Sequence, residues 1–225
     1  MIPKKIHYCW FGHNPLPKLA VKCIESWRKF LPDYEIKEWN ENNCDVYQFP
    51  NLVESYNDKN FAFVSNYFRF DVLYRYGGIY FDIDVEVIKD LTPIIENSGA
   101  AFGGIDTTGK FNAGVGIGGE KGLEIFKEFR DGYIREKYKQ NCSHYGYLSE
   151  MLSKYGFHRN QKTIEKFADI TIYPQEYFCP LNLYTNKLNI TTKTYTIHHF
   201  ANSWFSDTMK QKMIELHPEI KRRYE

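Results

Sequence analysis

The N-terminal part of the chain changes from a strand pattern to a helical one and back. Residues 4–12 are rich in strand-forming side chains and end at a glycine, whereas residues 16–32 carry apolar side chains at helical spacing and stop at Pro32. Residues 34–39 return to a strand pattern. A strand, a helix and a strand in this order predict a βαβ unit with two parallel strands.

The middle of the chain contains the clearest alternation. A helix is predicted from about Asp58 to Tyr76, because a glycine pair follows that suits a helix C-terminus. Residues 79–87 then alternate strictly and predict one strand with a buried face and a solvent face. The apolar face holds Ile79, Phe81, Ile83, Val85 and Val87, and the solvent face holds Tyr80, Asp82, Asp84 and Glu86.

The rest of the chain predicts further alternation of strands and helices. Strands are expected at residues 100–105, 111–119, 168–174 and 194–199, and helices at 91–98, 121–138, 144–156 and 209–225. This order favours an α/β fold with a mostly parallel central sheet. With 225 residues, 43% of them hydrophobic, the chain is long enough for one sizeable domain, which we expect over residues 1–225.

Charge and composition limit the classes of binding partner and the cellular compartment that we expect for this protein. Lys and Arg (29) nearly balance Asp and Glu (28), so we expect no nucleic-acid partner. The five cysteines are scattered and odd in number, which favours buried thiols in a reducing compartment. No apolar run reaches about 18 residues and the N-terminus does not look like a signal peptide, so we expect a cytoplasmic protein. A basic end leaves peripheral contact with the inner face of a membrane open: Lys210, Lys212, Lys221, Arg222 and Arg223.

The two acids of the predicted central strand suggest a cation site. Asp82 and Asp84 are two positions apart and would point the same way, so that both ionised they repel each other unless a cation lies beside them. Carboxylate oxygens suit hard divalent ions such as Mg²⁺ and Mn²⁺. The alternative is two exposed acids on an edge strand.

Other polar residues are weaker candidates by themselves. His198, His199 and Ser203 follow a predicted strand and are possible ligands for the same ion, although paired histidines are often structural. Ser65 and Arg69 share a helix face, and the arginine would hold a phosphate or a sugar hydroxyl, or else form a salt bridge with an aspartate such as Asp71 or Asp58.

Together these residues resemble a known family. The run AFVSNYFRFDVLYRYGGIYFDIDVE, residues 62–86, resembles the A-x-x-S-D-x-x-R-x-x-x-L-x-x-x-G-G-x-Y-x-D-x-D signature of the DXD sugar transferases of glycosyltransferase family 32. The opening IPKKIHYCWFG and the closing TIHHFANSW are similar to that family's first strand and its H-x-x-x-S-W element. The family includes bacterial capsular polysaccharide transferases and fungal initiating α-mannosyltransferases, and it is related to the glucosyltransferase domain of large clostridial toxins.

The resemblance implies a GT-A type, Rossmann-like nucleotide-sugar transferase fold. Residues 1–90 would form the nucleotide-binding half, and residues 91–225 the acceptor-side half. The implied activity is metal-dependent transfer of a hexose, with retention of anomeric configuration, from a probable UDP-sugar donor to a glycan, a lipid-linked glycan or a protein. Surface polysaccharide synthesis is the implied role.

The resemblance also implies roles for single residues. Asp82 and Asp84 would form the Mn²⁺ or Mg²⁺ and diphosphate site, completed by Ser203 and one of the two histidines, with His198 slightly favoured over His199. The residues expected at the nucleotide sugar are Trp10, Ser65, Arg69, Tyr80, Asp82, Asn112, Ser203 and Trp204. Asn66 stands where the family usually has an aspartate, which predicts altered donor specificity or weaker activity.

Rival interpretations remain at this point. The D-x-D string also resembles the nucleophile motif of haloacid dehalogenase-type phosphatases, in which Asp82 would attack phosphorus and Asp84 would act as acid or base. Residues 114–119 formally satisfy a dinucleotide-binding glycine pattern, but a glycine-bent strand that lines the sugar pocket near Asn112 explains them more simply. A relative that binds sugar without turnover is the third alternative.

Overall fold

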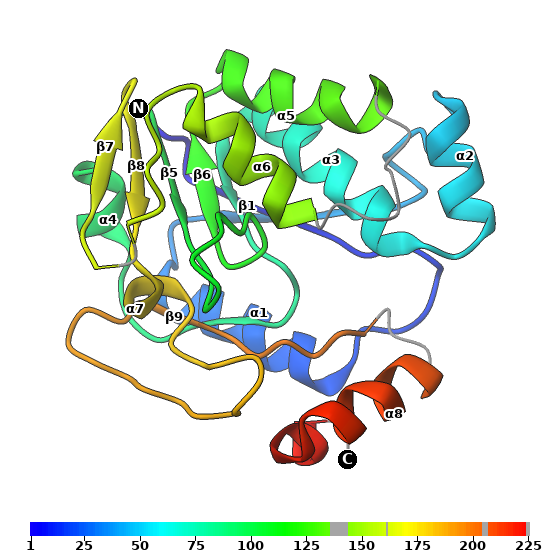
Figure 1. Ribbon diagram of the computed structural model, residues 1–225. Helices are drawn as coiled ribbons and strands as arrows, with labels where there is room; N and C mark the ends of the chain where they lie inside the picture. Colours follow the sequence, from blue (N-terminus) through cyan, green and yellow to red (C-terminus); the bar gives the residue numbers. More distant parts are fainter. Residues whose placement is uncertain (136–143, 161, 204–206, 224–225) are drawn as a thin grey trace.

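The protein is described from a computed structural model (Figure 1). The described residues are 1–135, 144–160, 162–203 and 207–223. Cys142 and Trp204, both considered above, lie outside these ranges. The four cysteines inside them are free, buried thiols, as expected: Cys9, Cys23, Cys44 and Cys179.

The centre of the fold is a mixed sheet. Within the described residues, seven strands pair in the order β2-β1-β3-β6-β5-β8-β7. Strand β1 is parallel to β2 and β3, and β5 is parallel to β8, whereas β6 and β7 are antiparallel to their neighbours. Strands β1, β2, β3, β5 and β8 therefore share one direction, and the α/β fold with a mostly parallel sheet is confirmed. The bounds are Lys5–Cys9 (β1), Glu35–Trp39 (β2), Gly78–Tyr80 (β3), Ala101–Gly104 (β5), Ile117–Gly119 (β6), Glu165–Phe167 (β7) and Ile170–Tyr173 (β8).

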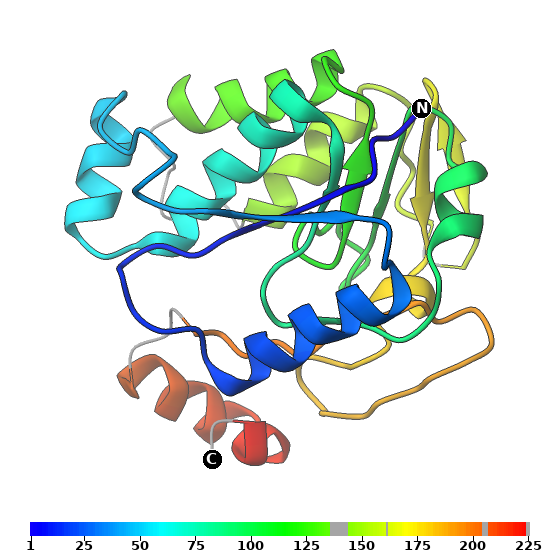
Figure 2. The same cartoon turned by 180° about the vertical axis from the view of Figure 1, so that it is seen from behind.

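Helices cover both faces of this sheet. Helices α3 (Phe61–Tyr76), α5 (Glu124–Arg135) and α6 (His144–Ser153) lie on one face, and α1 (Lys18–Phe30) lies on the other (Figures 1 and 2). The remaining helices are α2 (Pro50–Asn57), α4 (Thr92–Glu96), α7 (Gln175–Phe178), α8 (Asp207–Leu216) and the 3₁₀ helix η1 (Pro218–Arg223). In the described part of the chain, no helix combines the length and the apolar character that crossing a membrane would require.

Aromatic side chains fill the core on both faces. On the α3 and α5 side, the rings of Phe70 and Phe129 pack with centroids 4.9 Å apart. On the α1 side, Trp27 packs on Phe81 at 5.5 Å, and both side chains are fully buried. Aromatic residues make up 17% of the sequence, and those in the core stabilise the sheet–helix packing because such rings bury large apolar areas.

The βαβ unit and the central helix agree with their sequence patterns. Helix α1 buries side chains one turn apart, including Cys23 and Trp27, and β1 and β2 on either side of it pair in parallel register. Helix α3 is capped by Asn60, whose side chain accepts the Phe63 N–H at 3.3 Å. It ends at Gly77, where φ is 65° and a residue without a Cβ is favoured.

The single strand predicted at residues 79–87 is wrong. Strand β3 ends at Tyr80, the chain turns at residues 83–84, and β4 (Val85–Val87) leaves the main sheet to pair with β9 (Thr196–His198) in a separate two-stranded ribbon. A hydrogen bond from the Val85 N–H to the Asp82 carbonyl, 3.0 Å long, closes this turn.

The expected solvent face of that strand is wrong too. Tyr80 is 1% exposed and Asp84 is 8% exposed, so two of the four side chains expected at the solvent are buried, whereas Asp82 and Glu86 are partly exposed. The turn at residues 83–84 changes the direction of the side chains that follow it. A strict alternation of buried and exposed positions holds only within one continuous strand. The short elements α2, β7 and α7 were not predicted, and the strand expected at 111–119 is reduced to Ile117–Gly119.

Candidate functional site

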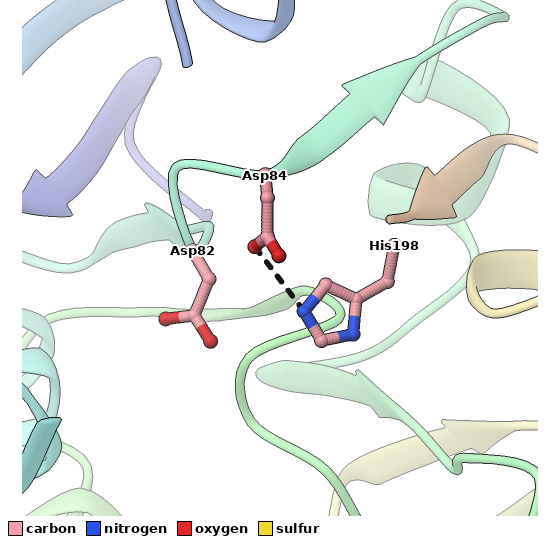
Figure 3. Close-up of side chains that lie close together, drawn as sticks. All are labelled: Asp82, Asp84 and His198. Carbon is pink, nitrogen blue, oxygen red and sulfur yellow. Dashed lines mark ion pairs between the residues drawn. The ribbon is translucent and has the colours of Figure 1, made fainter. Parts of the chain in front are cut away.

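Strand β4 brings the acidic turn against the C-terminal part of the chain. Because β4 pairs with β9 in the register Val85 to His198, the residue before Val85 lies next to the His198 imidazole. Figure 3 shows Asp82, Asp84 and His198 pointing toward one another, with the Asp84 Oδ1 to His198 Nε2 contact at 3.2 Å. One oxygen of each acid and one ring nitrogen all lie within 4.8 Å of one another.

Asp84 is buried and firmly held. Its Oδ2 accepts the Ala201 N–H at 2.7 Å, and its backbone carbonyl accepts the His199 N–H at 3.0 Å. Burial alone would raise the pKa of Asp84, but the His198 charge and these donors lower it below its usual value. Burial alone would lower the pKa of His198, but the Asp84 carboxylate raises it. Each partner therefore favours the charged form of the other.

Asp82 is fixed by different partners. Its Oδ1 accepts from Arg69 Nη2 at 2.9 Å and from the Tyr80 hydroxyl at 3.1 Å. The Arg69 guanidinium also lies 4.8 Å from the centre of the Tyr80 ring. Arg69 thus pairs with Asp82 and not with the aspartates considered from the sequence; Asp71 bonds instead to Arg75 and Arg130.

Tyr80 does not lie on an accessible face. Its ring is buried and only its hydroxyl reaches the acid, and burial raises the pKa of that hydroxyl well above its usual value. The hydroxyl therefore stays protonated and donates to Asp82, so that Arg69 and Tyr80 together orient one oxygen of the carboxylate.

The glycine-rich segment after β5 packs under the acids. The Gly114 carbonyl accepts the Asp82 N–H at 3.2 Å, and a Cβ at Gly114 would overlap the Asp82 carboxylate. Asn112 is fully buried, and its Oδ1 accepts the Gly114 N–H at 2.9 Å. Its Nδ2 has no hydrogen-bond partner among the described residues. The segment supplies a close backbone approach and one buried donor beside the acids.

Several predicted residues lie farther from the acids. His199 Nε2 contacts Glu86 Oε2 at 2.8 Å, on the side where Lys22 also pairs with Glu86. Ser203 is exposed, and no bond joins it to the acids within the described residues. Strand alternation therefore separates the two histidines, and the neighbour of Asp84 is His198.

The predicted nucleotide-sugar residues on the N-terminal side occupy two places. Trp10 follows β1, is half-buried, and donates its indole N–H to the Asn14 carbonyl at 2.6 Å. Ser65 and Asn66 are half-buried on α3, Ser65 one turn before Arg69. In the part of the chain that the structure describes, neither of these two side chains bonds to an acid.

The sequence analysis missed the residues that hold β4 in place. One edge of β4 pairs with β9, and α1 takes the place of a strand on the other edge: the Trp27 indole N–H donates to the Val85 carbonyl at 2.7 Å, and Ser26 Oγ accepts the Val87 N–H at 2.9 Å. The sequence gives only a weak signal for this role, a tryptophan at a helical core position, whose buried indole N–H usually finds an acceptor.

Comparison with known proteins identifies this acidic turn. Residues 17–100 match the family model described as glycosyltransferase sugar-binding region containing DXD motif. The match covers well under half of the chain and shows what these residues are similar to. Asp82 and Asp84 are the D-x-D of its sequence, and the region extends from α1 to α4.

Two fungal proteins are similar to part of the chain at the level of sequence. The chain is 31% identical over 98 residues to inositol phosphoceramide mannosyltransferase 3 of Schizosaccharomyces pombe, covering 42% of this chain and 27% of that protein. It is 27% identical over 106 residues to the initiation-specific α-1,6-mannosyltransferase of Candida albicans, covering 43% of this chain and 28% of that protein. The matched part is thus about a quarter of the length of these relatives.

Solved structures show that the fold around the DXD region is of the GT-A type. The PaToxG glycosyltransferase superposes with a TM-score of 0.53 at 18% identity, over 68% of either chain. The galactosyltransferase LgtC, solved with donor and acceptor sugar analogues, superposes with a TM-score of 0.50 at 15% identity, over 96% of either chain. At such identities the likeness concerns the fold alone.

Proposed function

We propose that the protein is a metal-dependent glycosyltransferase that moves a hexose from a nucleotide sugar, most simply a UDP-sugar, to a hydroxyl acceptor with retention of anomeric configuration. The observation that supports this most directly is the cluster of Asp82, Asp84 and His198 ligand atoms within 4.8 Å, in which the two acids come from the residues that match the DXD family model and the histidine comes from β9.

The donor set fits a divalent cation. Two carboxylates and one imidazole suit Mn²⁺, and the carboxylates alone would suit Mg²⁺. The Asp84 and His198 ion pair shows that this place already favours positive charge, because a buried imidazolium balances the carboxylate there. Asp82, Asp84 and His198 would hold the ion, and the imidazole would release its proton as the ion binds. A cation bound there supplies electrostatic stabilisation to the leaving diphosphate.

The chain's own residues would orient the donor. Arg69 and Tyr80 fix one oxygen of Asp82, which leaves the other oxygen available to the ion or to a sugar hydroxyl. The buried Nδ2 of Asn112 would donate to the sugar beside it. Ser65 and Asn66, one turn before Arg69, would line the sugar, with Asn66 replacing an acid by an amide that both donates and accepts. Trp10 would stack near the base, as the resemblance implies.

In this proposal, Ser203 and Trp204 have the role that the family resemblance implies. Ser203 and Trp204 follow His198 within a few residues, so that they would lie over the diphosphate once the donor is bound. The acceptor would be a glycan, free or lipid-linked, or a protein hydroxyl, and surface polysaccharide synthesis is the role that fits the resemblance.

A nucleotide-sugar panel tests the proposal. We expect hydrolysis of at least one UDP-sugar that requires Mn²⁺ or Mg²⁺ and stops with a chelator. Asp82→Asn and Asp84→Asn should each lower the rate roughly 10²- to 10³-fold, the range for losing one electrostatic group at a reacting centre. Asparagine is preferred to alanine at position 84 because that carboxylate is buried against His198.

Asp33→Asn is the matched control. Asp33 is an exposed acid whose one ion pair among the described residues is with Lys4, so the rate should not change. Hydrolysis that persists with a chelator would sink the metal-dependent mechanism. Phosphate release from a simple ester would favour the phosphatase instead, and donor binding without turnover would favour a non-catalytic sugar binder.

A further inference from the structure

A hollow outside the acidic cluster lies along β9 from His198. It has a volume of about 290 Å³ and is lined by Lys162, Gln175, Glu176, Pro180 and Asn189; we call it the α7 hollow. These residues come from three separate segments: the turn before β7, the helix α7 with the residues after it, and the long loop that leads to β9 (Figure 1). A hollow built from three segments is a feature of the tertiary fold and not of one loop.

Its lining is suited to a polyhydroxylated ligand. The side chains of Lys162, Gln175 and Asn189 make no hydrogen bond within the described residues, so their donors and acceptors are available to a ligand. Glu176 is held by Lys193, with Nζ to Oε1 at 2.9 Å, and Pro180 adds a buried apolar wall. Amide, carboxylate and ammonium groups around a small apolar wall are the groups that hydrogen-bond sugar hydroxyls and contact the C–H face of a sugar ring.

The α7 hollow is aligned with the acidic cluster. Residues 176–178 run beside residues 194–196, joined by hydrogen bonds from Thr194 Oγ1 to the Glu176 carbonyl at 2.9 Å and from the Tyr195 N–H to the Tyr177 carbonyl at 2.8 Å. The chain then continues from Thr194 to His198. Four residues of extended chain span about 13 Å, at about 3.3 Å per residue.

The positions of the two sites relative to the sheet also place the α7 hollow on the same edge as the acidic cluster. Gln175 and Glu176 follow the carboxyl end of β8, and Asp82 follows the carboxyl end of β3, which shares its direction. Open α/β sheets bind their ligands outside this edge. The α7 hollow and the acidic cluster therefore lie along one edge of the sheet. The distance between them is greater than the length of a single sugar ring.

We propose that the α7 hollow binds an oligosaccharide acceptor, with its reacting end beside the donor sugar at the acidic cluster and a later sugar unit beside Gln175, Glu176 and Asn189. This inference rests on the proposed function for the identity of the reacting end. The hollow itself would recognise a chain of sugars, and it would bind a monosaccharide more weakly because one ring cannot occupy both places.

Saturation-transfer NMR tests this with mono- and trisaccharides of glucose, galactose and mannose as probes. We expect at least one trisaccharide to bind more tightly than its monosaccharide. Gln175→Ala and Asn189→Ala should each weaken that binding about fivefold to tenfold, as expected for losing one hydrogen bond to a ligand. Asn42→Ala, which removes an exposed amide elsewhere on the surface, should leave it unchanged. Circular dichroism checks that each variant is folded.

Competition with nucleotide separates the α7 hollow from the donor site. Saturating UDP with Mn²⁺ should not displace the trisaccharide. Displacement, equal binding of mono- and trisaccharide, unchanged affinity in both hollow variants, or no binding of any saccharide would each overturn the inference. Trisaccharide binding by a wild-type protein that hydrolyses no nucleotide sugar would instead preserve the glycan site and refute the transferase.

Discussion

Removing the hydrogen bond from Trp27 to β4 tests how the fold positions Asp84. In Trp27→Phe the aromatic ring remains, but the Nε1–H that donates to the Val85 carbonyl at 2.7 Å is lost. Trp27 is fully buried, so the carbonyl is left without a partner, which costs about 1–3 kcal/mol of folding free energy. Because Val85 follows Asp84 directly, the turn that carries the acid also loses its attachment to α1.

The expected consequence is a loss of cation affinity beyond the loss of stability. Removing a group that orients a metal ligand typically weakens binding about 10- to 100-fold, and we expect the lower end, about tenfold or 1.4 kcal/mol, because Ser26 still holds Val87. Calorimetric titration with Mn²⁺ in the presence of UDP measures the affinity. Urea denaturation measures the stability.

Trp39→Phe is the matched control. Trp39 is also buried, and its indole N–H donates to His7 Nδ1 at 3.1 Å, between β2 and β1 and not to β4. Both variants should lose similar stability, but only Trp27→Phe should lose Mn²⁺ affinity. Equal loss of affinity in both variants, or an unchanged affinity in Trp27→Phe, would refute the positioning argument.

Three further predictions concern other parts of the structure. His7 is buried as the neutral tautomer, with Nε2 donating to Gly77 O at 2.8 Å and Nδ1 accepting from Trp39, and burial lowers its pKa from 6.5 to about 4. Below pH 6.5 the unfolded chain therefore takes up a proton that the folded chain does not, so about 3 kcal/mol of folding free energy should be lost as the pH falls from 6.5 to 4. Urea denaturation at several pH values should show this fall in stability in the wild type and not in His7→Gln. An equal dependence of stability on pH in both proteins would contradict the prediction. His198→Gln should weaken Mn²⁺ binding at least tenfold whereas His199→Gln should not, because only the former lies against Asp84; the reverse result in titration would transfer the ligand role to His199. Gly114→Ala should lower both Mn²⁺ affinity and the rate of nucleotide-sugar hydrolysis by about tenfold or more, since its methyl group would displace the Asp82 carboxylate; an unchanged Mn²⁺ affinity would show that the carboxylate is not held there.

The regular elements near the N-terminus were predictable because each satisfies its local pattern. The buried positions of α1 recur at helical spacing, and the glycine after Tyr76 marks the end of α3. The pattern at residues 79–87 failed because alternation describes side-chain direction within one strand. It carries no information on whether the chain stays in the same sheet, and here β3 and β4 belong to different sheets.

The candidate site was predictable only in part for a related reason. The acids were found from their spacing and from the resemblance, but the burial of Asp84 depends on His198 and Ala201, which are distant in the sequence. The pairing of β4 with β9 also separates His198 from His199, which the sequence left open. The hydrogen bond from Trp27 could not be predicted, because a tryptophan at a helical core position gives the same sequence pattern whether or not its N–H donates to a neighbouring strand.

The two-stranded ribbon of β4 and β9 makes the acidic cluster depend on the order of synthesis. β9 is the last strand in the described part of the chain, so Asp84 leaves the ribosome long before the His198 imidazole that pairs with it. A product cut short before Thr196 would contain all seven strands of the main sheet and α1, yet it would lack the third ligand. Competence to hold a cation there would therefore require synthesis to have passed β9.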